Sequence, residues 1–157
     1  MIVVADTSPI NYLILIEEID ILRQMYGTVV IPPAVRRELL RPSAPEIVRR
    51  YIGQLPAWLE VRSPSNPPEL SLVALDPGER DAIMLATELH ADQLIVDDRQ
   101  GRNEARKRGI PVMGTLGVLR EAATLGLLNL PAAVKRLEAT SFHIAPEVLM
   151  SLLKDHL

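Results

Sequence analysis

The chain has 157 residues, which is enough for one domain with its own hydrophobic core. Aromatic residues make up only 3% of it, so the core must be packed from aliphatic side chains. There is no Cys, which excludes disulfides, thiolate metal sites and cysteine nucleophiles and is compatible with a reducing compartment. No apolar stretch approaches the roughly 20 residues of a membrane span, and the N-terminus lacks a signal-peptide pattern. We therefore expect a cytoplasmic protein with no membrane anchor.

The net charge of −3 argues against nucleic-acid binding driven by overall charge alone. The basic residues are nevertheless clustered, in residues 36–41, 49–50 and 99–108. Solvated helix faces would explain any one cluster. Because three such clusters lie near candidate acidic sites, the sequence favours a polyanionic substrate despite the negative net charge.

Strands and helices alternate along the first part of the sequence, as is typical of a parallel α/β fold. In chain order, the apolar patterns predict a strand at 2–5, helices at 10–16 and 19–25, a strand at 28–31, a helix from Pro33, and a helix at 46–55. Ser8 is the expected N-cap of the first helix and Pro9 its first residue. The buried, β-branched strands indicate a sheet that is covered by helices on both faces.

The alternation continues through the middle of the chain and then gives way to helices. The patterns predict a short edge strand at 58–61, a proline-rich loop at 63–75, a helix at 77–90, a strand at 94–96, a helix at 101–108 and a strand at 111–113. The remaining predicted helices are 115–125, 131–139 and 146–155. With no internal repeat, residues 1–157 are expected to form a single domain.

Acidic residues directly follow two of the predicted strands. Asp6 follows the first strand, and Asp97 and Asp98 follow the strand at 94–96. The carboxyl ends of parallel strands border the crevice in which open α/β sheets bind ligands. Several carboxylates in one crevice repel one another unless a cation lies between them, so the pattern predicts a divalent-metal site. An Asx-turn is the alternative for Asp6, and the sequence does not decide which of Asp97 and Asp98 faces the crevice and which caps the next helix.

Two glutamates on predicted helices could reach the same crevice. Glu38 borders the apolar stripe of its helix, although a surface pair with a neighbouring arginine explains it equally well. Glu79 lies on the buried face of its helix and Asp81 on the flank, so Glu79 is preferred, although a capping box with Asp76 also accounts for it. The candidate catalytic residues are Asp6, Glu38, Glu79, Asp97 and Asp98. The candidate metal ligands among them are Asp6, Glu79, Asp97 and Asp98.

Carboxylate ligands suit Mg²⁺ or Mn²⁺, whose natural chemistry with a phosphodiester is attack by a metal-activated water. Arg102 is the basic residue expected nearest the site, paired with a carboxylate or a substrate phosphate. The three histidines lack zinc-ligand spacing, and no glycine pattern matches a phosphate-binding or dinucleotide motif. Ser8 has no histidine near it in sequence, so a serine hydrolase is not supported.

With these residues in place, the chain resembles the PIN-domain ribonucleases, especially the toxins of VapBC-type toxin–antitoxin modules. The resemblance is carried by residues 4–9, 31–39, 76–83, 95–102 and 114–119. It implies an α/β fold, a PIN-like three-layer α/β/α sandwich with a central parallel sheet and a helical C-terminal region. It also implies Mg²⁺- or Mn²⁺-dependent cleavage of RNA, a cognate antitoxin and a homodimer. Val96-Asp97-Asp98 replaces the common Thr-x-Asp, which leaves the register of the fourth acid open.

Other functions fit the sequence to different degrees. An RNA-processing PIN nuclease without an antitoxin would share every candidate residue, and an inactive PIN-like module that binds RNA or protein would not need the full acidic set. A receiver-type signalling domain would need an acidic neighbour beside Asp6 and a lysine after the strand at 111–113, and both are missing. A haloacid-type phosphatase would need an aspartate where Ser8 stands.

Overall fold

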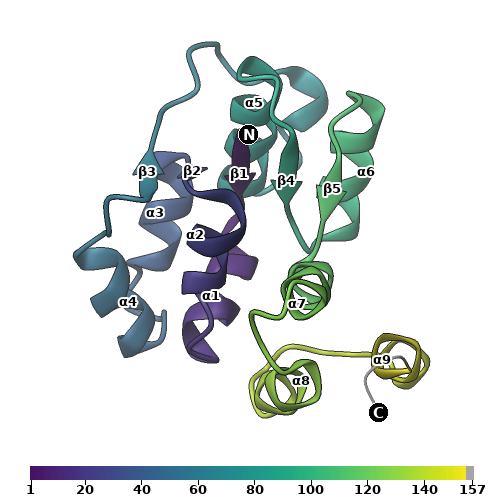
Figure 1. Ribbon diagram of the computed structural model, residues 1–157. Coiled ribbons are helices and arrows are strands. Elements are labelled where there is room, and N and C mark those ends of the chain that lie inside the picture. The colour runs from purple at the N-terminus through teal and green to yellow at the C-terminus, as the bar shows by residue number, and fades with distance from the viewer. Residues whose placement is uncertain (155–157) are drawn as a thin grey trace.

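The computed structural model describes residues 1–154 and is built on a five-stranded sheet (Figure 1). Its strands are β1 (Val3–Ala5), β2 (Val29–Ile31), β3 (Leu59–Val61), β4 (Gln93–Ile95) and β5 (Val112–Met113). Their order in the sheet is β3-β2-β1-β4-β5, and every neighbouring pair is parallel. β1 is therefore central, with Ala5 in register with Ile95 of β4.

Helices cover both faces of this sheet. They are α1 (Thr7–Leu15), α2 (Asp20–Tyr26), α3 (Pro33–Leu39), α4 (Glu46–Gly53), α5 (Pro77–Glu88), α6 (Arg99–Lys107), α7 (Thr115–Thr124), α8 (Leu130–Glu138) and α9 (Pro146–Leu153). Because side chains alternate along a strand, Val3 and Ala5 enter the core under α1–α4, α7 and α8, whereas Val4 enters the core under α5 and α6. The expected three-layer α/β/α sandwich is confirmed.

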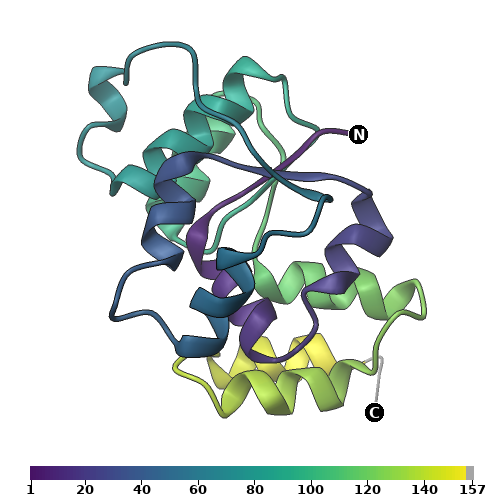
Figure 2. The same cartoon turned by 90° about the vertical axis from the view of Figure 1, so that its left-hand side faces the viewer.

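The C-terminal helices lie at one end of the molecule in both views (Figures 1 and 2). α8 contributes Leu130, Val134 and Leu137 to the core, whereas α9 has no buried residue and leaves Met150 74% exposed. No helix within residues 1–154 is long and apolar enough to cross a membrane.

Two local predictions were wrong. α1 begins at Thr7, with extended Asp6 rather than Ser8 at its N-cap position. Pro9 still falls in the first turn, where a helix needs no N–H donor. The segment predicted as a loop contains a short 3₁₀ helix, η1 (Leu70–Leu72), because Leu72 is buried against the α5 side of the core.

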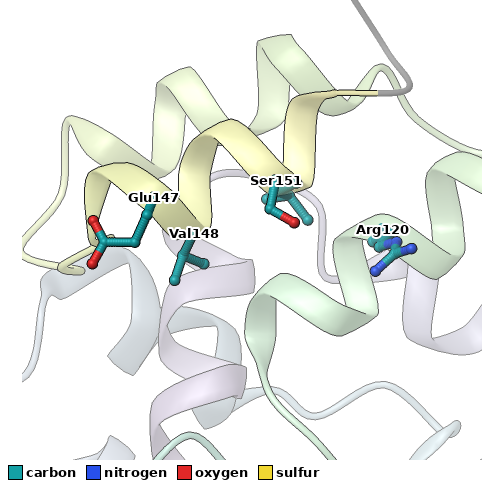
Figure 3. Close-up of a pocket in the computed structure, with 5 residues that line it drawn as sticks. Arg120, Glu147, Val148 and Ser151 are labelled. Carbon is teal, nitrogen blue, oxygen red and sulfur yellow. The ribbon is translucent and has the colours of Figure 1, made fainter.

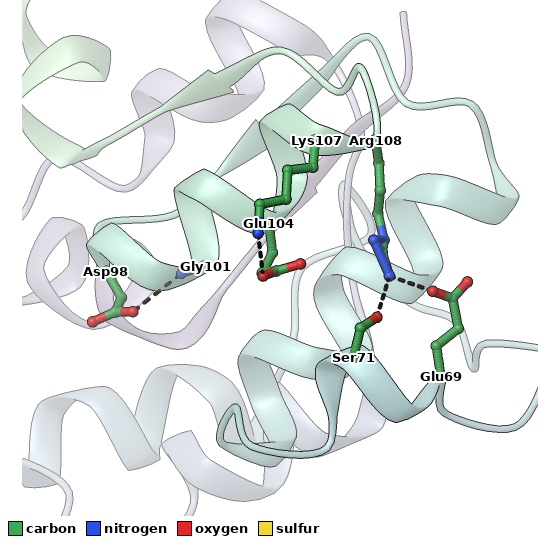
Figure 4. A network of polar contacts seen from close by, with 7 residues as sticks. All are labelled: Glu69, Ser71, Asp98, Gly101, Glu104, Lys107 and Arg108. Atoms are coloured by element: carbon green, nitrogen blue, oxygen red, sulfur yellow. Dashed lines mark hydrogen bonds and ion pairs between the residues drawn. The ribbon is translucent and has the colours of Figure 1, made fainter.

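The segment around η1 is attached to the helices beneath it. Arg108, just after α6, donates hydrogen bonds to Glu69 and Ser71 (Figure 4). Glu88 of α5 accepts hydrogen bonds from the backbone of Ser65 at 2.8 and 2.9 Å. These contacts fix the approach of the chain to the start of α5.

The chain leaves the two central strands in opposite directions. After β1 it enters α1 on one face of the sheet, and after the neighbouring β4 it enters α6 on the other face. The resulting crevice at the carboxyl ends of β1 and β4 is the topological switch point at which open α/β sheets bind ligands.

Candidate metal centre

Asp6 lies at the bottom of this crevice. Its backbone N–H donates to the carbonyl of Ile95 at 2.9 Å, so the residue continues the sheet, and it is only 4% exposed. Its side chain does not cap α1, and its Oδ1 has no hydrogen-bond partner within the described residues. A buried carboxylate oxygen without a partner is costly, and a cation would remove that cost.

Glu38 reaches the crevice from α3, which packs against α5. Thr7 Oγ1 donates a hydrogen bond to Glu38 Oε2 at 3.1 Å and so fixes the carboxylate beside the start of α1. The close approach of Glu38 to α5 also depends on Gly78, which is buried at the start of that helix. A β-carbon at position 78 would overlap Glu38 Oε2. Glycine is therefore required here for space and not for an unusual backbone conformation.

The start of α5 brings two more carboxylates to the crevice. Asp76 is the N-cap of α5 and accepts hydrogen bonds from the backbone of Gly78 at 3.0 Å and Glu79 at 3.3 Å. The Glu79 carboxylate lies 3.7 Å from the place that a β-carbon of Gly101 would occupy, so it faces α6. Asp81 instead pairs with Arg80 Nε at 3.0 Å. Of the two acids weighed from the sequence, only Glu79 faces the crevice.

Asp98 begins α6 at the opposite wall. Its side chain accepts a hydrogen bond from the backbone of Gly101 at 3.2 Å and caps the helix (Figure 4). It also lies near enough to Glu79 for its charge to raise the pKa of that residue. Asp98 thus both caps the helix and borders the crevice, two roles that the sequence analysis divided between neighbouring aspartates.

The carboxylates of Asp6, Glu38, Asp76, Glu79 and Asp98 are named here the acidic cluster, and three of its members have raised pKa values. Burial raises the pKa of Asp6 to about 8, helped by the charges of Glu79, Asp76 and Glu38. Burial raises the pKa of Glu79 to about 7, helped by Asp98, Asp76 and Glu38. Burial, followed by the charge of Asp76, also raises the pKa of Glu38. Carboxylates that resist ionisation together are the environment in which a cation is most strongly held.

Asp97 is not part of this cluster. Its carboxylate accepts hydrogen bonds from Thr115 N and Thr115 Oγ1, both at 2.7 Å, and from Ser8 Oγ at 3.0 Å. These bonds join the end of β4 to the first turns of α1 and α7. Both oxygens are therefore engaged in holding three elements together, and the structure does not bring Asp97 to the other candidate ligands.

Sequence reasoning missed three residues of the site. Asp76 was interpreted only as a helix cap, although the Asp-Pro-Gly-Glu order at the start of α5 places its charge beside Glu79. Ser8 and fully buried Thr115 were missed because the partner that they share, Asp97, lies far from both in sequence.

The donor set fits Mg²⁺ or Mn²⁺, although the metal site is not preformed. Within residues 1–154, no three Asp, Glu or His side chains converge closely enough to make a complete metal cage. Mg²⁺ does not need one, because it commonly binds through one or two carboxylates and keeps several waters. The unpaired oxygen of Asp6 and the all-oxygen surroundings are what such an ion requires.

Comparison with known proteins agrees with this fold. The family model described as PIN domain (DUF3368) matches residues 2–156. Among solved structures, the fold is similar to that of a PilT N-terminus domain protein from the hyperthermophilic archaeon Sulfolobus solfataricus P2. The TM-score is 0.54 at 22% identity, over 92% of this chain and 100% of that one. No curated protein matches the chain.

Proposed function

This chain belongs to the PIN domain family, and from that premise we propose that it is a Mg²⁺- or Mn²⁺-dependent endoribonuclease. PIN domains are typically nucleases that use one of these ions. The observation that carries the proposal is Asp6, a buried carboxylate with an unpaired oxygen at the switch point of the sheet and with like charges around it. Such a site is unfavourable without a cation and is suited to binding one.

Asp6, Glu79 and Asp98 would hold the ion, with Glu38 beside them. When bound, the ion supplies a water activated for attack on a phosphodiester and offsets the negative charge of the phosphate. Thr7 fixes the Glu38 carboxylate through its hydrogen bond, and Gly78 leaves the space in which that carboxylate lies.

The Asp97 hydrogen bonds serve the same arrangement indirectly. By joining the end of β4 to α1 and α7, they hold the elements that present Asp6 and Asp98 at a constant separation. Without a cation, the acidic cluster would repel the phosphate backbone of RNA. Cleavage should therefore depend on the metal at the binding step as well as at the chemical step.

Incubation with a single-stranded RNA labelled at its 5′ end tests the proposal. Internal cleavage is expected with Mn²⁺ or Mg²⁺ and no cleavage with a chelator. The Asp6→Asn variant should be inactive while remaining folded, and Asp81→Asn, which removes a nearby charge that is paired with Arg80, is the matched control. Cleavage in chelator, or full activity in folded Asp6→Asn, would refute the metal-nuclease proposal.

We further propose that the chain acts as the toxin of a VapBC-type module, as a homodimer that a cognate antitoxin inhibits. The support is the exposure of apolar side chains near the C-terminal end: Leu125, just after α7, and Val148 and Met150 of α9 are 59%, 46% and 74% exposed. Expression should arrest growth, and the product of a neighbouring reading frame should relieve the arrest. Sedimentation at micromolar concentration should show a dimer. Normal growth in the presence of confirmed RNA cleavage would favour the RNA-processing alternative.

A further inference from the structure

Two hollows lie near the carboxyl ends of β4 and β5, at the edge of the sheet that also carries the acidic cluster. The first, the α7 cleft, has a volume of about 520 Å³ and is lined by Arg102 of α6, Arg120 of α7 and Phe142, among others. The second, the α6 pocket, has a volume of about 420 Å³ and is lined by Asp97, Arg99, Arg102, Asn103 and Arg106. Both volumes are typical of small-ligand sites, which run from about 300 to 1,000 Å³. Asp97 and Arg102 line both hollows, so the two adjoin at these residues.

The α6 pocket is cationic. Arg99, Arg102 and Arg106 are three or four residues apart, so they lie on one face of α6. Within residues 1–154 none of the three forms an ion pair. Lys107 and Arg108 differ, because they are paired with Glu104 and Glu69 (Figure 4). The basic segment predicted from the sequence therefore divides into a paired group and a group that is open to an anion.

Arg102 carries a specific sign of a missing partner. Its Nε is buried and has no hydrogen-bond partner within the described residues. A buried donor that is left unpaired costs roughly 1–3 kcal/mol, which an incoming acceptor would remove. A guanidinium group matches the oxygens of a phosphate through two parallel hydrogen bonds.

The α7 cleft has a different chemistry, with one aromatic and several aliphatic side chains beside Arg120. Phe142 is held in place by Tyr12, whose ring meets it edge-on at 5.0 Å between centroids and 83° between planes. Tyr12 is fixed in turn by a 2.8 Å hydrogen bond between its hydroxyl and Ser141 Oγ. Nucleobases stack on rigid aromatic rings and on arginine planes.

Arg120 stands between the α7 cleft and a further hollow of about 270 Å³. Figure 3 shows Arg120 on α7 and Glu147, Val148 and Ser151 on α9, all lining that hollow. Arg120 is exposed and forms no ion pair within the described part of the chain, residues 1–154. Its guanidinium group is therefore available to a ligand in the α7 cleft.

We propose that the two hollows together bind one nucleotide of single-stranded RNA next to the scissile bond, with its phosphate in the α6 pocket and its base in the α7 cleft. The inference rests on the proposed nuclease function and names a specificity site for it. Asp97, which borders both hollows, precedes Asp98 of the acidic cluster in the chain, so the hollows and the cluster share the carboxyl end of β4. A base in a duplex would have to leave its stack to enter the α7 cleft, so the site selects single strands.

The two parts of the site can be tested separately by binding, in an Asp6→Asn background that does not cut the probe. The probes are a fluorescent eight-nucleotide single-stranded RNA, its duplex, and an abasic ribose-phosphate oligomer of equal length. Arg102→Ala should raise the Kd for the single strand and for the abasic oligomer about tenfold, and should reduce the salt slope by roughly 0.7. Arg120→Ala should raise the Kd about tenfold for the single strand only.

Matched variants complete the design. Arg50→Ala removes a charge on α4 whose exposed pair with Glu46 stabilises little, so it should leave every Kd within about twofold. Arg106→Ala, at an exposed position of the same pocket, repeats the Arg102 test with less risk to folding. Arg102→Lys should restore the salt slope while recovering only part of the affinity, since a lysine cannot bind a phosphate through two parallel bonds.

The outcomes separate this site from the nuclease function. Unchanged RNA affinity in the Arg102, Arg106 and Arg120 variants would overturn the nucleotide site even if the wild type cleaves RNA, and would leave the α7 cleft to a protein ligand. Equal affinity for duplex and single strand would also overturn it. Weakened binding in the variants, with no cleavage by the wild type in Mn²⁺, would support the site while refuting the nuclease proposal.

Discussion

Gly78 lies so close to Glu38 that any β-carbon at position 78 would overlap the Glu38 carboxylate. Thr7 Oγ1, which donates a hydrogen bond to that carboxylate, would lie 3.0 Å from the same β-carbon, so both partners of the bond border position 78. Three separate elements therefore determine where Glu38 points: the start of α1, α3 and the first turn of α5.

The variant Gly78→Ala should therefore lower cleavage without removing any charge. We expect a loss of at least about tenfold in kcat/KM, because a displacement of about 1 Å in a catalytic group can cost a hundredfold. The measurement is metal-dependent cleavage of single-stranded RNA, with melting followed alongside. Gly53→Ala is the control, since a β-carbon at that helical position meets nothing within 4 Å. Equal activity of the two variants would show that the position of Glu38 is not important.

The order of the strands and helices could be predicted from the sequence because it depends on local patterns. β1 and the run Leu94-Ile95-Val96 around β4 are apolar and buried, and the acids that follow such runs lie at the carboxyl edge of a parallel sheet. That reasoning identified Asp6 as a neighbour of the crevice and left Asp97 and Asp98 as alternatives, of which Asp98 borders it in the structure. The helix-face argument likewise separated Glu79 from Asp81.

Contacts that depend on distant segments could not be predicted. Asp97 looked equivalent to Asp98 because the two are adjacent, and only the position of α7 shows that Thr115 engages Asp97 with two hydrogen bonds. Asp76 met every requirement of a helix cap, so its charge seemed explained. Its second role depends on α3 bringing Glu38 to the start of α5, which no local pattern encodes.

Asp97→Asn and Asp98→Asn should therefore have different effects. Asp97→Asn removes the charge that strengthens three hydrogen bonds and requires the Thr115 and Ser8 hydroxyls to turn and accept from its NH₂ group, so we expect the free energy of unfolding to fall by about 1–3 kcal/mol. Asn caps helices about as well as Asp, so Asp98→Asn should keep its stability and lose about tenfold or more in Mn²⁺ affinity. Urea denaturation and calorimetric titration with Mn²⁺ measure the two quantities. A stable Asp97→Asn protein with weakened Mn²⁺ binding would place Asp97 among the ligands after all.

A second pair of variants tests the direction of the acids on α5. Glu79→Gln should reduce Mn²⁺-dependent cleavage by about a hundredfold or more, because it removes a charge that faces Asp98 and Glu38. Asp81→Asn should change cleavage by less than about threefold, because Asp81 pairs with Arg80 outside the acidic cluster. Initial rates at saturating Mn²⁺ give the comparison. The reverse ranking would mean that Asp81, and not Glu79, serves the metal.

The last prediction concerns pH and follows from Asp6. Its pKa is raised to about 8 in the folded protein by burial and by the neighbouring acids, against 3.8 for an unperturbed aspartate. Between these values the folded state keeps a proton that the unfolded state releases, so the stability of the metal-free protein should fall as pH rises from about 4 to about 8. The raised pKa values of Glu79 and Glu38 act in the same direction. In chelator, the wild-type Tm should therefore drop by about 5 °C or more between pH 5 and pH 8.5, and Mn²⁺ should restore it at the higher pH.

Asp6→Asn has no charge to bury, so its Tm in chelator should decline less over that range and should gain less from Mn²⁺. Identical pH profiles for the wild type and Asp6→Asn would show that Asp6 ionises freely in the fold, and would remove the strongest argument for a cation at this site.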